Sequence, residues 1–211
     1  MREGWHVYWL NPGDSGTDPH ISWRLPEGFS VGKPEWPAPQ RFAKPPFATF
    51  GHEGELLLAH EVSVPAGLEP GTVVKIGADI EWLVCDEICI GQSASVEIDL
   101  PVAQTASPSP ADPLFADAKY RLPETVSDWK FSAIYDNRSA KLIIEPPASV
   151  SLQNADALTF FPAQQGVFRH GSIKTSIDEG TIRVDMQRTG LPPDERLRGV
   201  IVLNEVISGQ P

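Results

Sequence analysis

Short runs of alternating apolar and polar side chains dominate this chain, a pattern typical of strands that bury one face. In the first half these runs cover 6–10, 21–25, 55–64, 72–84 and 93–100. In the second half they cover 129–136, 141–146, 157–162, 172–178, 181–188 and 197–206. The Asp178-Glu179-Gly180 step between two such runs is typical of a hairpin turn. The pattern predicts an all-β chain.

Two segments depart from the alternation. Residues 26–50 are rich in proline, which predicts a long surface loop rather than a central strand. Residues 101–113 are rich in Pro, Ala and Ser and have no periodic apolar face, which is typical of a linker. After the linker, Asp112 and Pro113 predict the start of one short helix.

We therefore predict two antiparallel β-sandwiches of the immunoglobulin-like type. The first covers 1–104, the linker 105–112, and the second 113–211. In the second sandwich, the segment FFPAQQGVFRHG (160–171) stands out. We interpret it as a buried aromatic pair beside a turn, with a partner-binding loop as the alternative.

Composition and charge exclude several classes of protein. Hydrophobic residues make up 41% of the 211 residues, which is sufficient for packed cores. The net charge is −11 and no basic face is visible, so we exclude a nucleic-acid binder. No apolar run reaches the ~18 residues of a membrane span, so we expect no membrane insertion of this chain. The first ten residues do not resemble a signal peptide, and we expect the chain to derive from a longer protein.

The only cysteines are Cys85 and Cys89, which flank Asp86, Glu87 and Ile88. A zinc site needs four ligands, and one pair with five scattered histidines does not supply them by spacing. A disulfide across a three-residue connection between neighbouring strands is sterically possible. It would close a very short loop and constrain the unfolded chain little. A redox-active pair, a structural bridge and a metal site completed by His6 and His52 all remain open at this point.

The acidic residues between the cysteines affect the chemistry that the pair can perform. Negative charge beside a sulfur disfavours the thiolate. Asp86 and Glu87 should therefore raise the thiol pKa and make the pair a poor general nucleophile. We expect it to react mainly with a partner that supplies an activated cysteine.

Four segments together resemble a known family. GWHVYWLNPGDSG, WPAPQRF, FGHEGELLL and WLVCDEICIG, in this order, are similar to the N-terminal periplasmic domain of the thiol:disulfide interchange protein DsbD family. The likeness is greatest to its ScsB-like (suppressor of copper sensitivity) branch. It covers about 1–104 strongly and 113–207 more loosely.

The resemblance implies an electron relay in the bacterial periplasm, without metal or organic cofactor. Membrane-embedded and thioredoxin-like domains of a DsbD-type reductase would reduce this module, which would then reduce thioredoxin-fold partners. Cys85 and Cys89 match the redox pair, with Cys89 forming the mixed disulfide and Cys85 resolving it. The chain would thus be part of a protein-disulfide reductase system connected with copper tolerance.

The resemblance also implies residues around the sulfurs. His6 and Tyr8 match a strand that carries active-site aromatics, and Phe47 or Phe50 would cap the disulfide. Two alternatives stay open: a non-catalytic immunoglobulin-like interaction module with a structural disulfide, and a periplasmic copper or zinc binder using His6 and His52.

Overall fold

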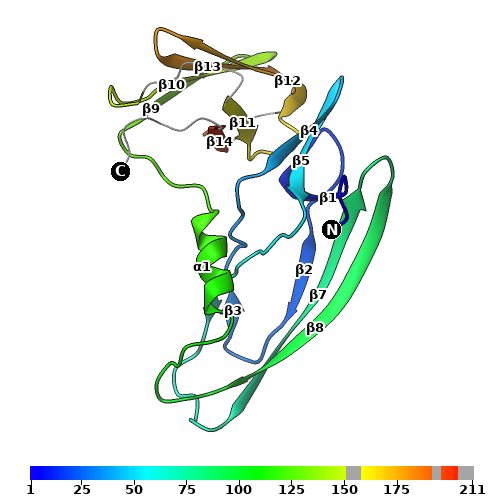
Figure 1. Ribbon diagram of the computed structural model, residues 1–211, viewed down its shortest axis with the longest axis vertical. Coiled ribbons are helices and arrows are strands. Elements are labelled where there is room, and N and C mark those ends of the chain that lie inside the picture. The colour runs from blue at the N-terminus through cyan, green and yellow to red at the C-terminus, as the bar shows by residue number, and fades with distance from the viewer. Residues whose placement is uncertain (151–157, 192–195, 204–211) are drawn as a thin grey trace. The chain divides into compact units, whose positions relative to one another are not determined.

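The computed structural model describes residues 1–150, 158–191 and 196–203, which form β-strands and one helix (Figure 1). The elements up to residue 101 are β1 (His6–Gly13), β2 (His20–Arg24), β3 (Ser30–Val31), β4 (Gln40–Lys44), β5 (Phe47–Glu53), β6 (Val62–Ser63), β7 (Val73–Cys85) and β8 (Cys89–Pro101). Those that follow are α1 (Asp112–Tyr120), β9 (Lys130–Tyr135), β10 (Ser139–Glu145), β11 (Leu158–Pro162), β12 (Phe168–Asp178), β13 (Thr181–Arg188) and β14 (Gly199–Leu203). The predicted all-β, immunoglobulin-like class is confirmed.

The chain folds into two compact units, and the residues that each unit contains differ from those of the predicted domains. Unit 1 contains residues 1–9, 17–37 and 52–122; unit 2 contains 10–16, 38–51 and 123–211. Strands β1 and β5 thus contribute residues to both units. The division at 105–112 describes a boundary along the sequence and stays a prediction.

Unit 1 is built around the β7–β8 hairpin, drawn as two long curved strands in Figure 1. The two strands pair antiparallel from Val73↔Pro101 to Cys85↔Cys89. The other edge of β7 pairs with β2 and then with the start of β1. One face of β7 is apolar, while its opposite face carries the ion pairs Arg24–Asp79 and Lys75–Asp99. This alternation is what the sequence pattern predicts.

Unit 2 contains the four-stranded sheet β12-β13-β10-β9 and the β11–β14 pair. Apolar side chains from these strands form its core, among them Ile144, Phe160, Ile182 and Val184. The predicted hairpin turn at 178–180 is confirmed: Asp178 pairs with Thr181, and Glu179 and Gly180 have φ angles of 47° and 78°. Phe160 and Phe161 are buried before a turn, as interpreted from the sequence.

Two predictions for the first half were wrong. Residues 55–64 are not one strand: they contain β6 and an isolated bridge between Ala59 and Glu35. The alternation has another cause, because Leu56, Leu58 and His60 lie against the apolar face of the sheet. Residues 26–50 contain the β4–β5 hairpin, with β5 between β1 and β4 in the sheet. Pro45 and Pro46 lie in its turn, where missing N–H groups do not interrupt the ladder.

The predicted helix is confirmed as α1, which begins at Asp112 and has proline in its first turn. The Asp112 carboxylate accepts a hydrogen bond from the backbone N–H of Ser109 at 3.0 Å. None of the helix residues is buried. Among the described residues, no helix has the length and apolar character needed to span a membrane.

Candidate functional site: a disulfide at the tip of a hairpin

Three strands each contribute one side chain to a row at the end of the β7–β8 hairpin. His6 on β1 is directly opposite Cys85 on β7, and Cys85 is directly opposite Cys89 on β8. Directly opposed residues in an antiparallel sheet point to the same face, with Cβ atoms about 4.5–5.5 Å apart. His6, Cys85 and Cys89 therefore lie side by side on one face of unit 1.

Tyr8 joins this row because it follows His6 by two residues and points to the same face. The rings of His6 and Tyr8 meet edge to face, with centroids 5.3 Å apart. The Tyr8 hydroxyl lies 3.5 Å from the Cys89 Sγ atom. The structure thus brings His6 and Tyr8 beside Cys85 and Cys89, where the family resemblance led us to expect them.

Cys85 and Cys89 form a disulfide, and their Cα atoms are 4.2 Å apart. The two sulfurs differ in environment. Cys85 is 1% exposed, whereas Cys89 lies in the exposed class. Because Cys89 is the exposed residue of the pair, we expect a partner to reach its sulfur more readily than that of Cys85.

Asp86, Glu87 and Ile88 form the exposed connection between the strands. The backbone N–H of Asp86 donates to the Ile88 carbonyl at 3.1 Å, which closes the tip. The Asp86 carboxylate lies beside Gly4, where an added Cβ atom would be 3.8 Å from Oδ2. The acids thus flank the sulfurs, and their effect on the thiol pKa stays a prediction.

The two predicted capping residues belong to unit 2 and differ from each other. Phe47 is 59% exposed, and its role stays a prediction. Phe50 is fully buried, and its ring packs edge to face on Phe161 and His170, with centroids 5.0 Å away in each case. The ring of Phe50 is therefore part of the core of unit 2.

His52, the histidine considered as a metal ligand beside His6, is buried in unit 1. Its ring stacks on Trp36 with centroids 6.1 Å apart. Burial lowers the pKa of His52 to about 4, so the ring is neutral near pH 7. Across 1–150, 158–191 and 196–203, no three His, Cys, Asp or Glu side chains are grouped to hold a metal ion.

Residues 1–101 match the family model described as thiol:disulfide interchange protein DsbD, N-terminal. Residues 1–101 belong to this DsbD N-terminal family. A solved structure with the same fold is the N-terminal periplasmic domain of ScsB from Proteus mirabilis. Its TM-score is 0.74 at 19% identity, over 97% of this chain and 80% of the ScsB chain. No significant match was found among curated protein sequences.

The NPGDSG segment forms a buried polar network in unit 2. Asn11 is fully buried, and its side-chain amide donates to the carbonyl oxygens of Pro162 and Gln164 at 2.6 and 3.1 Å. The Asp14 carboxylate accepts hydrogen bonds from the backbone N–H groups of Ala48, His170 and Gly171 at 2.8–2.9 Å. The motif therefore binds the end of β1 to β5 and β12.

His170 completes this network, although no partner for it could be assigned from the sequence. Its Nδ1 atom lies 3.1 Å from Asp14 Oδ1, and its Nε2 atom 3.1 Å from Asn11 Nδ2. Burial lowers the pKa of His170, and the nearby Asp14 opposes that shift. Burial alone would raise the pKa of Asp14, but the three backbone donors and His170 together hold it below its ordinary value. Asp14 and His170 are 156 residues apart, so their pairing could not be recognised from the sequence.

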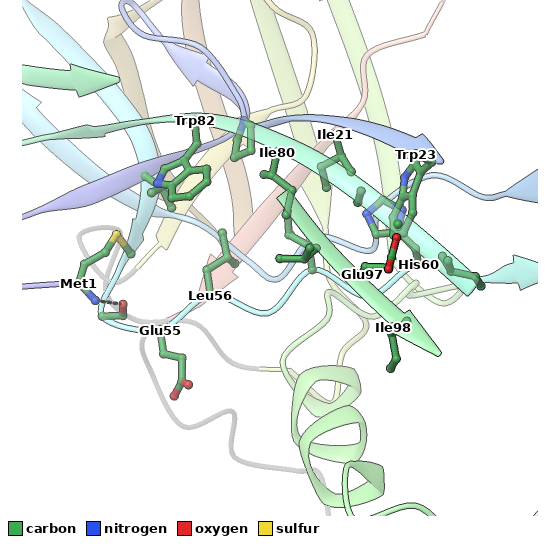
Figure 2. A pocket seen from close by; sticks show the side chains of 18 residues that line it. Met1, Ile21, Trp23, Glu55, Leu56, His60, Ile80, Trp82, Glu97 and Ile98 are labelled. Atoms are coloured by element: carbon green, nitrogen blue, oxygen red, sulfur yellow. Dashed lines mark hydrogen bonds between the residues drawn. The ribbon is translucent and has the colours of Figure 1, made fainter. Parts of the chain in front are cut away.

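The apolar face of the sheet in unit 1 carries a separate cavity of about 570 Å³. Figure 2 shows Ile21, Trp23, Ile80 and Trp82 on the strands, with Leu56 and His60 facing them. Trp82 and Cys85 are an odd number of residues apart on β7, so they point to opposite faces. The cavity is therefore separate from the disulfide row.

Proposed function

We propose that the protein is a periplasmic thiol–disulfide exchange module that relays reducing equivalents through Cys85 and Cys89. Membership of the DsbD N-terminal family supports an interchange module, and the disulfide supplies its chemistry. The periplasmic location rests on that family and on the likeness to the ScsB periplasmic domain. The observation that carries the proposal is the asymmetry of the pair at the hairpin tip, where the residue Cys89 is exposed and the residue Cys85 is buried.

The proposed reaction is a pair of thiolate displacements. In the direction that oxidises a partner, the partner's first thiolate attacks Cys89 Sγ and the Cys85–Cys89 bond breaks, which releases the electron pair to Cys85 Sγ. The partner's second thiolate then attacks the partner sulfur of the mixed disulfide, which forms the partner's disulfide and releases Cys89 as a thiolate. In the reducing direction, Cys89 attacks the partner's disulfide, and Cys85 then attacks Cys89 Sγ to release the reduced partner. Cys89 is thus the exchanging sulfur and Cys85 the resolving sulfur.

The proposed partners are thioredoxin-fold proteins, which present an activated cysteine. Electrons would come from the membrane-embedded and thioredoxin-like domains of a DsbD-type reductase. The acids Asp86 and Glu87 would keep the thiols unreactive toward other oxidants. A role in copper tolerance is part of the proposal only through the likeness to the ScsB branch.

The test uses two single-cysteine variants of the full chain, Cys85→Ala and Cys89→Ala, with oxidised glutathione as the probe. The folded Cys85→Ala protein should form a mixed disulfide at least about tenfold faster, because its remaining sulfur is exposed. In urea, where burial is lost, the rates should converge. Equal rates in the folded state contradict the assigned roles. Failure of both variants to capture a thioredoxin-fold protein from periplasmic extract contradicts the relay.

The alternative function is an interaction module in which the Cys85–Cys89 disulfide is purely structural. A structural bridge should have a reduction potential below about −300 mV, whereas an exchanging pair should equilibrate with glutathione or thioredoxin buffers. Titration against such buffers therefore separates the two functions. A metal-binding function would require that the reduced protein bind Cu⁺ or Zn²⁺ in a direct titration.

A further inference from the structure

The buried position of Cys85 poses a chemical problem for the proposed exchange reaction. When a thiolate attacks Cys89, the negative charge develops on Cys85, whose side chain is 1% exposed. Burial disfavours a charged sulfur and raises the thiol pKa. The carboxylates at 86 and 87 flank the same hairpin tip and add to the penalty. Opening the disulfide therefore requires a proton close to the Cys85 sulfur.

His6 is the group placed to supply that proton. It lies directly across the β1–β7 ladder from Cys85, is 6% exposed, and is held in place by its edge-to-face contact with Tyr8. An imidazole can both donate and accept a proton, which suits transfer in both directions. Tyr8 on β1 and the exposed acids Asp86 and Glu87 of the connection are further titratable groups near this row.

We propose that His6 exchanges a proton with the Cys85 sulfur during thiol–disulfide exchange. This inference rests on the proposed function. As the Cys85–Cys89 bond breaks, the electron pair goes to Cys85 Sγ and protonated His6 donates a proton to that sulfur. In the reverse step, neutral His6 accepts the proton from the Cys85 thiol. The resulting thiolate then attacks Cys89 Sγ and releases the partner's thiolate.

Tyr8 has a different role in the same row. Its hydroxyl is 3.5 Å from Cys89 Sγ. In the first step this sulfur exchanges its bond to Cys85 for a bond to the partner, so it does not become a thiolate. Tyr8 orients the Cys89 sulfur and the His6 ring, and is a positioning residue. Tyr8→Phe should therefore slow exchange without removing the pH dependence that His6 imposes.

The experiment measures reduction of the disulfide by dithiothreitol from about pH 5 to about pH 9, with each rate divided by the thiolate concentration. The wild-type rate constant should be high at low pH and fall as His6 loses its proton. His6→Phe keeps an aromatic ring beside Tyr8 and should be slower by about tenfold or more at low pH, with no inflection. His60→Phe is the matched control, because His60 also meets an aromatic ring edge to face in unit 1, but on the cavity face.

A second measurement separates proton transfer from misfolding. In the Cys89→Ala background, absorbance near about 240 nm reports the Cys85 thiolate, and adding His6→Gln should raise the thiol pKa by about one unit or more. An unchanged pH profile in both His6 variants, with wild-type protein that exchanges normally, overturns the inference. A wild-type disulfide that neither dithiothreitol nor a thioredoxin-fold protein reduces would instead overturn the proposed function.

Discussion

Asp14→Asn should destabilise unit 2 far more than the loss of one charge suggests. Asp14 Oδ2 accepts from the backbone N–H groups of Ala48 and Gly171, and Oδ1 accepts from the backbone N–H and ring of His170. Asparagine has one acceptor oxygen, so its amide nitrogen must face two donors in either orientation. At about 1–3 kcal/mol for each donor left without a partner, the cost is about 2–6 kcal/mol.

The matched control is Asp136→Asn, since Asp136 also accepts from two backbone N–H groups, those of Arg138 and Ser139, but is exposed. Water can replace these bonds, so we expect a loss below about 1 kcal/mol. Urea unfolding at pH 7, followed by fluorescence and circular dichroism, measures both variants. Equal losses would refute the reasoning, because they would show that burial of the Asp14 network contributes nothing.

Asp14→Asn should also change how the free energy of unfolding depends on pH, and the direction of that change follows from the pKa of Asp14. The folded pKa of Asp14 is lowered, so its carboxylate contributes stability that is present above the unfolded value near 3.8 and lost as pH falls through the folded pKa. The difference in unfolding free energy between wild type and Asp14→Asn should therefore shrink below about pH 4. A difference that stays constant down to about pH 2 would contradict the assigned charge state.

Three further predictions concern other parts of the chain. Because burial lowers the pKa of His52 to about 4, stability should fall by up to about 3 kcal/mol as pH drops from about 6.5 to about 4, and His52→Phe should remove that slope in pH-dependent unfolding. Gly171→Ala should lower the melting temperature markedly, since its Cβ would lie 1.9 Å from a backbone carbonyl oxygen, whereas Gly91→Ala meets nothing within 4 Å and should be near neutral. Reducing the Cys85–Cys89 disulfide should lower the unfolding free energy by about 2 kcal/mol or less, because the five-residue loop restricts the unfolded chain little; a larger loss would favour the structural bridge.

The sequence predicted the fold class well because apolar and polar side chains alternate along most of the long strands. Alternation located β7, β8 and β10 to β13 within a few residues, and Asp112 with Pro113 marked the helix. The strand prediction for residues 55–64 was wrong because the alternation there has another cause. Leu56 and Leu58 alternate because they face an apolar sheet surface, not because they belong to a ladder.

From the spacing of Cys85 and Cys89 alone, a disulfide was sterically possible, but a metal site remained open as well. The placement of His6 beside Cys85 came only through family resemblance, since strand register is not readable from one sequence. The network of Asn11, Asp14 and His170 could not be found at all. A buried polar side chain is recognised by its partners, and these partners are more than 150 residues away along the chain.

The passage of β1 and β5 through both compact units bears on how the chain can be divided for experiments. A fragment ending at residue 104 would keep the disulfide and His6. It would also keep the buried amide of Asn11 and the carboxylate of Asp14, together with the ring of Phe50, and it would lose the backbone and aromatic groups of 160–171 that these side chains contact. Such a fragment would expose orphaned polar groups and an aromatic surface. Excising the redox hairpin as a minimal domain therefore requires redesign of residues 10–16 and 38–51.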